Sequence, residues 1–395
     1  GAADIYVLLN ASSKGDETCF TMKPGGPGTP AAGRPAPREM VDDAPFPPPA
    51  SPAALAKIKN MPANIWVAAK PNFEATPRSW STMCWDPWLR CVIYQGGGHR
   101  GTMDNTTSAY FPEANAWVNA FKSQWPTKIQ WNVSSIPNNL SFERGVEGSD
   151  HDRWYESLGG IMIGTARSGF DWATREKHMQ SSVPWFSKNF PFSDGTAGFV
   201  VHPLRPEVIS FSGGTYAGKA GESIQVYNIE TGKSETHKTS GPTPFIPCEW
   251  SGVTVHPDKD LLVLHGAADG KNRAGGTQTW TLDLKAPTAW KKLDLKSTTP
   301  PSGPGKLCAV PGTDYCVLAT PSSHDLWVLD LARNAWKPLP VANPKDFLQR
   351  KRGGTTRFDL YGHCVWDPHH KIVITVAGRH GTVLLKPDFS KIKWE

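Results

Sequence analysis

Five segments of the chain align on a turn proline, and this shared register limits the possible folds more than any other feature. Each segment reads as a short apolar strand, a tight turn that contains the proline, and a second apolar strand. Two further strand-like runs follow, and the unit recurs about every 45 to 60 residues. A degenerate sixth copy fits residues 149–172. The five prolines are Pro87, Pro203, Pro257, Pro311 and Pro368.

Units of this kind predict an all-β fold in which four-stranded antiparallel sheets stack around an axis. A single four-stranded meander cannot bury both of its faces, whereas a ring of blades covers them and leaves only short edges. The six copies occupy residues 78–394, and the N-terminal runs DIYVLLN and NIWVAAK offer strands for one more. We therefore expect a β-propeller of seven blades, with six as the alternative.

The expected organisation divides the chain at residue 77. Residues 78–395 form the propeller blades, while residues 1–77 supply strands, a Pro-rich strap over residues 23–53 and an irregular blade that closes the ring. In four of the five clear copies the fourth run carries a tryptophan, which we interpret as a packing residue. These tryptophans are Trp117, Trp290, Trp336 and Trp394.

The blade pattern resembles the kelch-type propeller of the galactose oxidase superfamily, over about 80% of the chain. The GGGH at Gly96–His99 directly follows the second strand of the first copy. It is similar to the corresponding stretch of propeller polysaccharide lyases of the ulvan lyase type. That resemblance implies β-elimination in an acidic polysaccharide, with His99 as acid or base beside Tyr and Arg helpers. The copper site of galactose oxidase cannot be assembled from this sequence, so oxidase chemistry is not expected.

The shared register also predicts which loop residues lie together. Because antiparallel strands reverse at each turn, the proline turns lie on one face of the disc and the loops after the second strands lie on the other. His99 and His380 both come 12 residues after their proline, Tyr216 comes 13 after, and the degenerate copy places Arg167 in the same slot. We expect His99 and Tyr216 to transfer protons and Arg167 to bind the substrate carboxylate.

Further residues near this rim are candidates for substrate binding. Aromatic residues recur seven positions before three of the prolines, where they serve either as sugar-stacking platforms or as packing residues. Neighbouring cations would neutralise or orient a uronate. The predicted binding residues are Arg100, His380, Arg379, Trp80, Trp250, Tyr361, His363, His265, Arg273 and Glu249.

Two copies carry cysteines on both sides of the proline turn. The pairs are Cys84 with Cys91 and Cys308 with Cys316, and we expect either disulfides across these hairpins or four buried free thiols. Disulfides would favour a secreted or periplasmic protein.

Other signals narrow the function. No zinc, calcium or phosphate-loop motif is present, so we expect no required cofactor, and a structural cation remains open. A membrane-spanning helix needs about 18 apolar residues in a row, and no apolar run in this sequence is close to that length. The net charge of +6 is spread without basic blocks, which favours an acidic polysaccharide or oligosaccharide over nucleic acid as the partner of a monomeric chain. The alternatives are a non-catalytic glycan- or protein-binding propeller and a His-dependent glycoside hydrolase.

Overall fold

The structure of the protein is a computed structural model, and strands dominate it. It describes residues 5–10, 17–22, 47–72, 82–95, 107–119, 155–158, 161–164, 199–212, 218–228, 231, 233–246, 252–267, 276–296, 301, 305–319, 326–344, 347–348, 350–352, 355–357, 364–377 and 380–394. In this part of the chain, no helix is long and apolar enough to cross a membrane.

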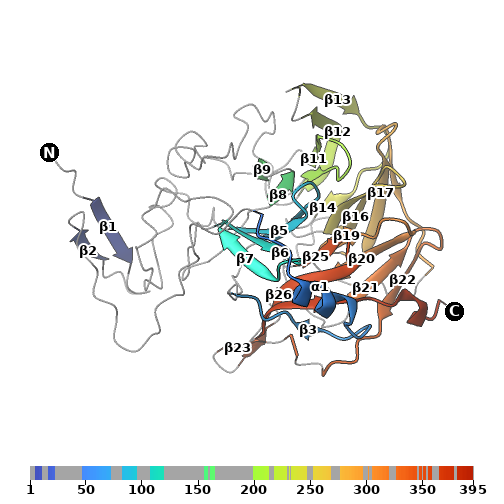
Figure 1. Cartoon of the computed structure of the whole chain (residues 1–395). Helices are drawn as coiled ribbons and strands as arrows, with labels where there is room; N and C mark the ends of the chain where they lie inside the picture. The colour runs from blue at the N-terminus through green and yellow to red at the C-terminus, as the bar shows by residue number, and fades with distance from the viewer. Residues whose placement is uncertain are drawn as a thin grey trace.

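Within the described residues, five antiparallel sheets form the blades of a β-propeller (Figure 1). The first blade consists of β4 (Thr82–Asp86), β5 (Cys91–Gln95), β6 (Thr107–Phe111) and β7 (Ala116–Asn119). The second consists of β10 (Phe199–Val201), β11 (Glu207–Ser212), β12 (Gly218–Asn228) and β13 (Ser234–Lys238), and β14 (Phe245–Ile246) also pairs with β12. The third consists of β15 (Gly252–His256), β16 (Leu261–Ala267), β17 (Gln278–Asp283) and β18 (Trp290–Lys292).

The last two blades follow the same plan, with one exchange of strands. The fourth consists of β19 (Lys306–Ala309), β20 (Tyr315–Ala319), β21 (Leu326–Asp330) and β22 (Ala335–Leu339). The fifth consists of β25 (Cys364–Asp367), β26 (Ile372–Ala377), β27 (Gly381–Leu385) and the distant β3 (Val67–Ala68). Its outermost strand therefore comes from the N-terminal part of the chain. The fourth run expected at the C-terminus contains instead a short 3-10 helix, Phe389–Lys391, before Trp394.

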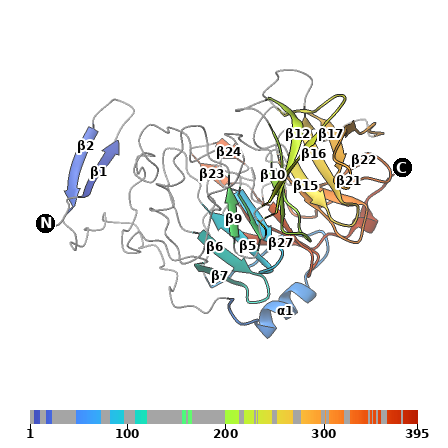
Figure 2. The same ribbon diagram turned by 90° about the horizontal axis from the view of Figure 1, so that it is seen from above.

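The first strands of the blades form a ring. β10 packs on β15, β15 on β19, β19 on β25, and β25 on β4. Between the first and second blades lies the hairpin of β8 (Tyr155–Leu158) and β9 (Ile161–Gly164), in which β8 packs against both β4 and β10. Figure 2 shows strands of the first, second and third blades from above.

The described structure has five blades, so the expectation of seven blades and its alternative of six are both corrected. The run NIWVAAK supplies β3 to the fifth blade instead of building a blade of its own. The run DIYVLLN forms β1 (Ile5–Asn10), which pairs with β2 (Glu17–Met22) in a separate two-stranded sheet. The degenerate copy contributes only the two strands β8 and β9 to the described structure. A further hairpin joins β23 (Arg350–Arg352) to β24 (Thr355–Arg357).

Helix α1 (Pro52–Lys59) seals the seam between the first and fifth blades. It begins at Ser51, whose hydroxyl accepts a hydrogen bond from the Ala54 amide, and it has a proline in its first turn, as helix N-termini favour. Its Ile58 packs in one cluster with Trp117 of the first blade and Leu384 of the fifth. The Lys57 ammonium donates to the Ala68 carbonyl of β3 at 2.9 Å. The helix thus holds β3 against the ring.

The four predicted packing tryptophans lie between neighbouring blades, which confirms their role. Trp394, although it follows a 3-10 helix instead of lying in a fourth strand, stacks on Tyr315 of the fourth blade with ring centres 5.8 Å apart. Trp117 Nε1 donates to Thr382 Oγ1 of the fifth blade at 2.7 Å, and Trp336 Nε1 donates to Thr279 Oγ1 of the third blade at 3.0 Å. Trp290 meets Phe211 of the second blade edge to face, with ring centres 5.8 Å apart. The repeated tryptophan is therefore a joint between one blade and the blade before it.

The cysteine prediction of hairpin disulfides is wrong for the described chain. In the pairing of β4 with β5, Cys84 lies opposite Ile93, so Cys84 and Cys91 are offset by two residues along the hairpin. Across β19 and β20, Cys316 lies opposite Ala309, the neighbour of Cys308. Since opposite residues share a face and adjacent residues alternate, Cys308 and Cys316 point to opposite faces. All four of these cysteines, and Cys364, are buried and form no disulfide within the described residues.

The joint at Thr279 offers a direct test of this packing. We expect Thr279→Val to lower the free energy of unfolding by about 2–4 kcal/mol, because it leaves the Trp336 N–H and one nitrogen of His265 buried without partners. Thr277→Val, at the exposed residue two positions earlier, should change it by less than about 0.5 kcal/mol. Urea unfolding followed by circular dichroism measures both, and equal effects would contradict the proposed joint.

Candidate functional site

The structure gives two kinds of information about the predicted rim: the framework that carries it, and two of its residues. His265 and His380 are described. The other predicted site residues lie outside the described residues; they are His99, Tyr216, Arg167, Arg100, Arg379, Trp80, Trp250, Tyr361, His363, Arg273 and Glu249.

The framework has two distinct mouths. All five turn prolines line a single cavity on the axis, which confirms that the aligned turns share one face of the disc. The second strands β5, β11, β16, β20 and β26 run away from these turns, so they end at the opposite mouth. The loops that begin after these strands therefore start around that opposite mouth.

His380 lies at the start of β27, at the mouth opposite the prolines. Its imidazole stacks on the ring of Phe347, with ring centres 4.2 Å apart and planes 15° from parallel. The side chain is half-buried. This mouth therefore carries a planar aromatic pair, which holds the imidazole of His380 in a fixed orientation.

His265 has a different environment, inside the third blade. It is fully buried, its Nδ1 lies 2.9 Å from the Thr279 hydroxyl, and its Nε2 lies 3.0 Å from the Pro301 carbonyl. Because Trp336 donates to the Thr279 oxygen, we assign the hydroxyl proton to His265 Nδ1 and the ring proton to Nε2. Burial lowers the pKa of His265 to about 4, although the Pro301 carbonyl opposes this shift. The neutral ring of His265 therefore packs in the interface between blades.

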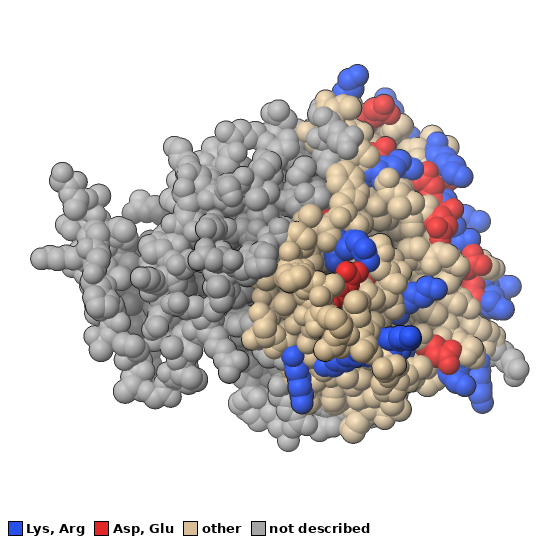
Figure 3. All heavy atoms as spheres, in the orientation of Figure 1, with Lys and Arg blue, Asp and Glu red and all other residues tan. Residues whose placement is uncertain are grey.

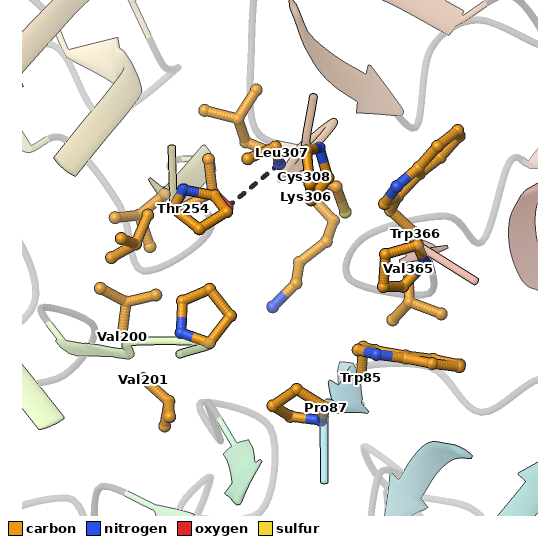
Figure 4. A pocket seen from close by; sticks show the side chains of 17 residues that line it. Trp85, Pro87, Val200, Val201, Thr254, Lys306, Leu307, Cys308, Val365 and Trp366 are labelled. Atoms are coloured by element: carbon orange, nitrogen blue, oxygen red, sulfur yellow. Dashed lines mark hydrogen bonds between the residues drawn. The ribbon is translucent and has the colours of Figure 1, made fainter. Parts of the chain in front are cut away.

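The axial cavity at the proline mouth is a feature that the sequence analysis missed. Its volume is about 120 Å³, and it is lined mainly by prolines, valines and two tryptophans, with the Lys306 side chain reaching into its middle (Figure 4). Trp85 and Trp366 each lie two residues before a turn proline, so the alignment of the copies on their prolines could have predicted that both residues lie at this mouth. Lys306 is only 5% exposed.

Three of the five turns around this mouth are capped by the side chain of the residue that precedes the proline. Asp86 Oδ1 accepts hydrogen bonds from the Trp88 and Leu89 amides at 3.0 and 2.8 Å. Asp367 caps its own turn in the same way, and His202 Nδ1 accepts from the Leu204 amide at 3.1 Å. Such side-chain caps hold a turn in a single conformation. His202 therefore serves as a turn residue.

Charges give the described surface no single sign. Lys and Arg side chains alternate with Asp and Glu over the face shown in Figure 3. Arg205, for example, pairs with Glu207 at 2.7 Å and with Asp260 at 2.8 Å. Within the described ranges, no group of three or more His, Cys, Asp or Glu side chains is arranged to hold a metal ion.

No protein-family model and no curated protein matches this chain. The function is therefore inferred from the residues and from the fold.

The buried imidazole predicts how stability depends on pH. The pKa of His265 is about 4 in the folded protein and near 6.5 in the unfolded chain, so the unfolded chain binds more protons between these values. The stability contributed by the neutral ring is complete above pH 6.5 and is lost as pH falls toward 4, by about 3 kcal/mol.

Urea unfolding across this pH range measures the effect. We expect His265→Gln, which keeps a polar side chain but does not titrate, to show a smaller loss of stability on acidification than the wild type. Identical pH dependence in the two proteins would contradict the assignment.

Proposed function

We propose that the protein is an extracytoplasmic, kelch-type propeller that cleaves a uronate-containing polysaccharide by β-elimination. The proposed site is the mouth opposite the proline turns. The observation that best supports this location is that all five turn prolines line one cavity. The loops that carry His99, Tyr216 and His380 follow the second strands, and those strands end at the other mouth. A shared rim for these residues is thus compatible with the described framework.

The proposed reaction needs three groups. A base takes the proton on the carbon beside the uronate carboxylate and leaves a carbanion. Its electron pair forms the carbon–carbon double bond as the bond to the glycosidic oxygen breaks, and an acid gives that oxygen a proton. His99 and Tyr216 are assigned to the two proton transfers, since imidazole and phenol exchange protons readily. Arg167 is assigned to the carboxylate, whose negative charge would otherwise oppose the carbanion.

Secondary contacts would hold the sugar chain. The stacked rings of His380 and Phe347 offer a planar surface at this mouth, and sugar rings pack well on aromatic faces. Trp80, Trp250 and Tyr361 are assigned the same role, with Arg100 and Arg379 facing the acidic groups. The net charge of +6 favours a polyanionic substrate.

The direct test is an assay against acidic polysaccharides. Elimination creates a conjugated, ultraviolet-absorbing uronate without consuming water, whereas hydrolysis gives reducing ends and no such absorbance. We expect absorbance to rise with at least one uronate polymer and to stay flat with neutral glucans. New reducing ends without ultraviolet absorbance would support the glycoside hydrolase instead. Binding with no product would support the non-catalytic propeller.

Substitution of His99 then tests the assigned role. We expect His99→Ala to lower kcat/KM by at least ~10²-fold, because a general acid or base contributes that much, while thermal stability stays close to wild type. The matched control is His237→Ala, on the outermost strand β13 of the second blade. Full activity in His99→Ala, or an equal loss in both variants, would remove His99 from the mechanism.

A further inference from the structure

We propose that the axial cavity at the proline-turn mouth is a binding site for a small carboxylate with an apolar or aromatic body. It is separate from the polysaccharide site proposed above, because it opens among the turns that precede the second strands. The proposal rests on the charge, the hydrogen-bond donors and the shape of the cavity, and it does not depend on the polysaccharide reaction.

The first observation is the charge. Lys306 is the first residue of β19, and its ammonium reaches the middle of the cavity (Figure 4). The described lining includes this one cation and no Asp or Glu. An anion beside this ammonium would gain from the low dielectric of the apolar walls, whatever else the lysine contacts in the protein. The cavity therefore favours a negatively charged ligand.

The second observation is a pair of hydrogen-bond donors. Trp85 and Trp366 both line the cavity, and their buried Nε1 atoms have no hydrogen-bond partner within the described protein. Trp366 is only 6% exposed. Buried donors are nearly always paired, so an acceptor is expected near them. A carboxylate has two oxygens and about four acceptor positions, enough for an ammonium and an indole together.

The third observation is the shape of the walls. Apart from Lys306 and Thr254, the lining is apolar, and the Thr254 hydroxyl already accepts a hydrogen bond from the Ala309 amide at 3.2 Å. The volume of about 120 Å³ approaches that of cavities that hold a benzene ring, about 150 Å³. Five proline rings and several valines would contact the apolar part of the ligand, which a bare inorganic anion would leave unfilled.

Titration of the intact protein with benzoate tests the proposal, with benzyl alcohol as a neutral ligand of similar size. Calorimetry gives the affinity, and fluorescence reports the tryptophans in the wall. We expect saturable binding of benzoate and binding of benzyl alcohol weaker by at least ~10-fold, since a hydrogen bond to a charged group contributes that much. No saturable binding of benzoate, or equal affinity for both ligands, would overturn the proposal.

Two variants separate the charge from the indole donor. Lys306→Met keeps the length of the side chain and should weaken benzoate binding by at least ~10-fold, while the control Lys291→Met, exposed on β18, should bind as the wild type does. Trp366→Phe removes the N–H and should weaken benzoate more than benzyl alcohol. If Lys306→Met does not fold, Trp366→Phe and the comparison of the two ligands still decide. Wild-type affinity for benzoate in a folded Lys306→Met would contradict the inference.

Discussion

The pairing of β3 with β27 holds the two ends of the propeller together. Val67 and Ala68 pair with Leu384 and Val383, so a strand from the N-terminal region completes the last blade. Without it, β27 would expose its free edge, and the seam beside Trp117 would open to solvent. Helix α1 covers the same seam. The ring of first strands, the convergence of the five prolines and the existence of an axial cavity all follow from this closure.

Closure gives the two mouths different characters. At one mouth the turns are short, contain proline, and in three blades are capped by Asp86, His202 or Asp367. This mouth is rigid, and its small apolar cavity suits a small ligand. At the other mouth the second strands end, and four of the five connections that begin there are as long as the proline turns or longer. Binding or catalytic residues are commonly carried by loops on a rigid scaffold. The two proposed sites differ in size and chemistry for this reason.

The sequence predicted the parts of the fold that depend on a repeated register. The turn prolines and the packing of Trp117, Trp290 and Trp336 were predicted correctly, because each repeats at a fixed place in the unit. The blade count was wrong because a two-residue strand such as β3 cannot be told from the start of a new blade without its partner. Ser51 and Pro52 did signal the start of α1, but the Pro-rich surroundings concealed it. For the cysteines, the spacing around the turn did not determine which residues of the two strands lie opposite each other. For His265, burial depends on contacts with Pro301 and Trp336, which are distant in sequence.

Distances between spin labels test the shared register most directly. Labels at Trp88→Cys and Asp258→Cys occupy two proline turns, whereas labels at Trp88→Cys and Thr277→Cys lie at opposite mouths. Cys19 and Cys248 are replaced by Ser, and the five buried cysteines stay. Pulsed electron paramagnetic resonance should give a shorter distance for the first pair than for the second. An equal or longer distance between the two turn labels would contradict the convergence of the turns on one cavity.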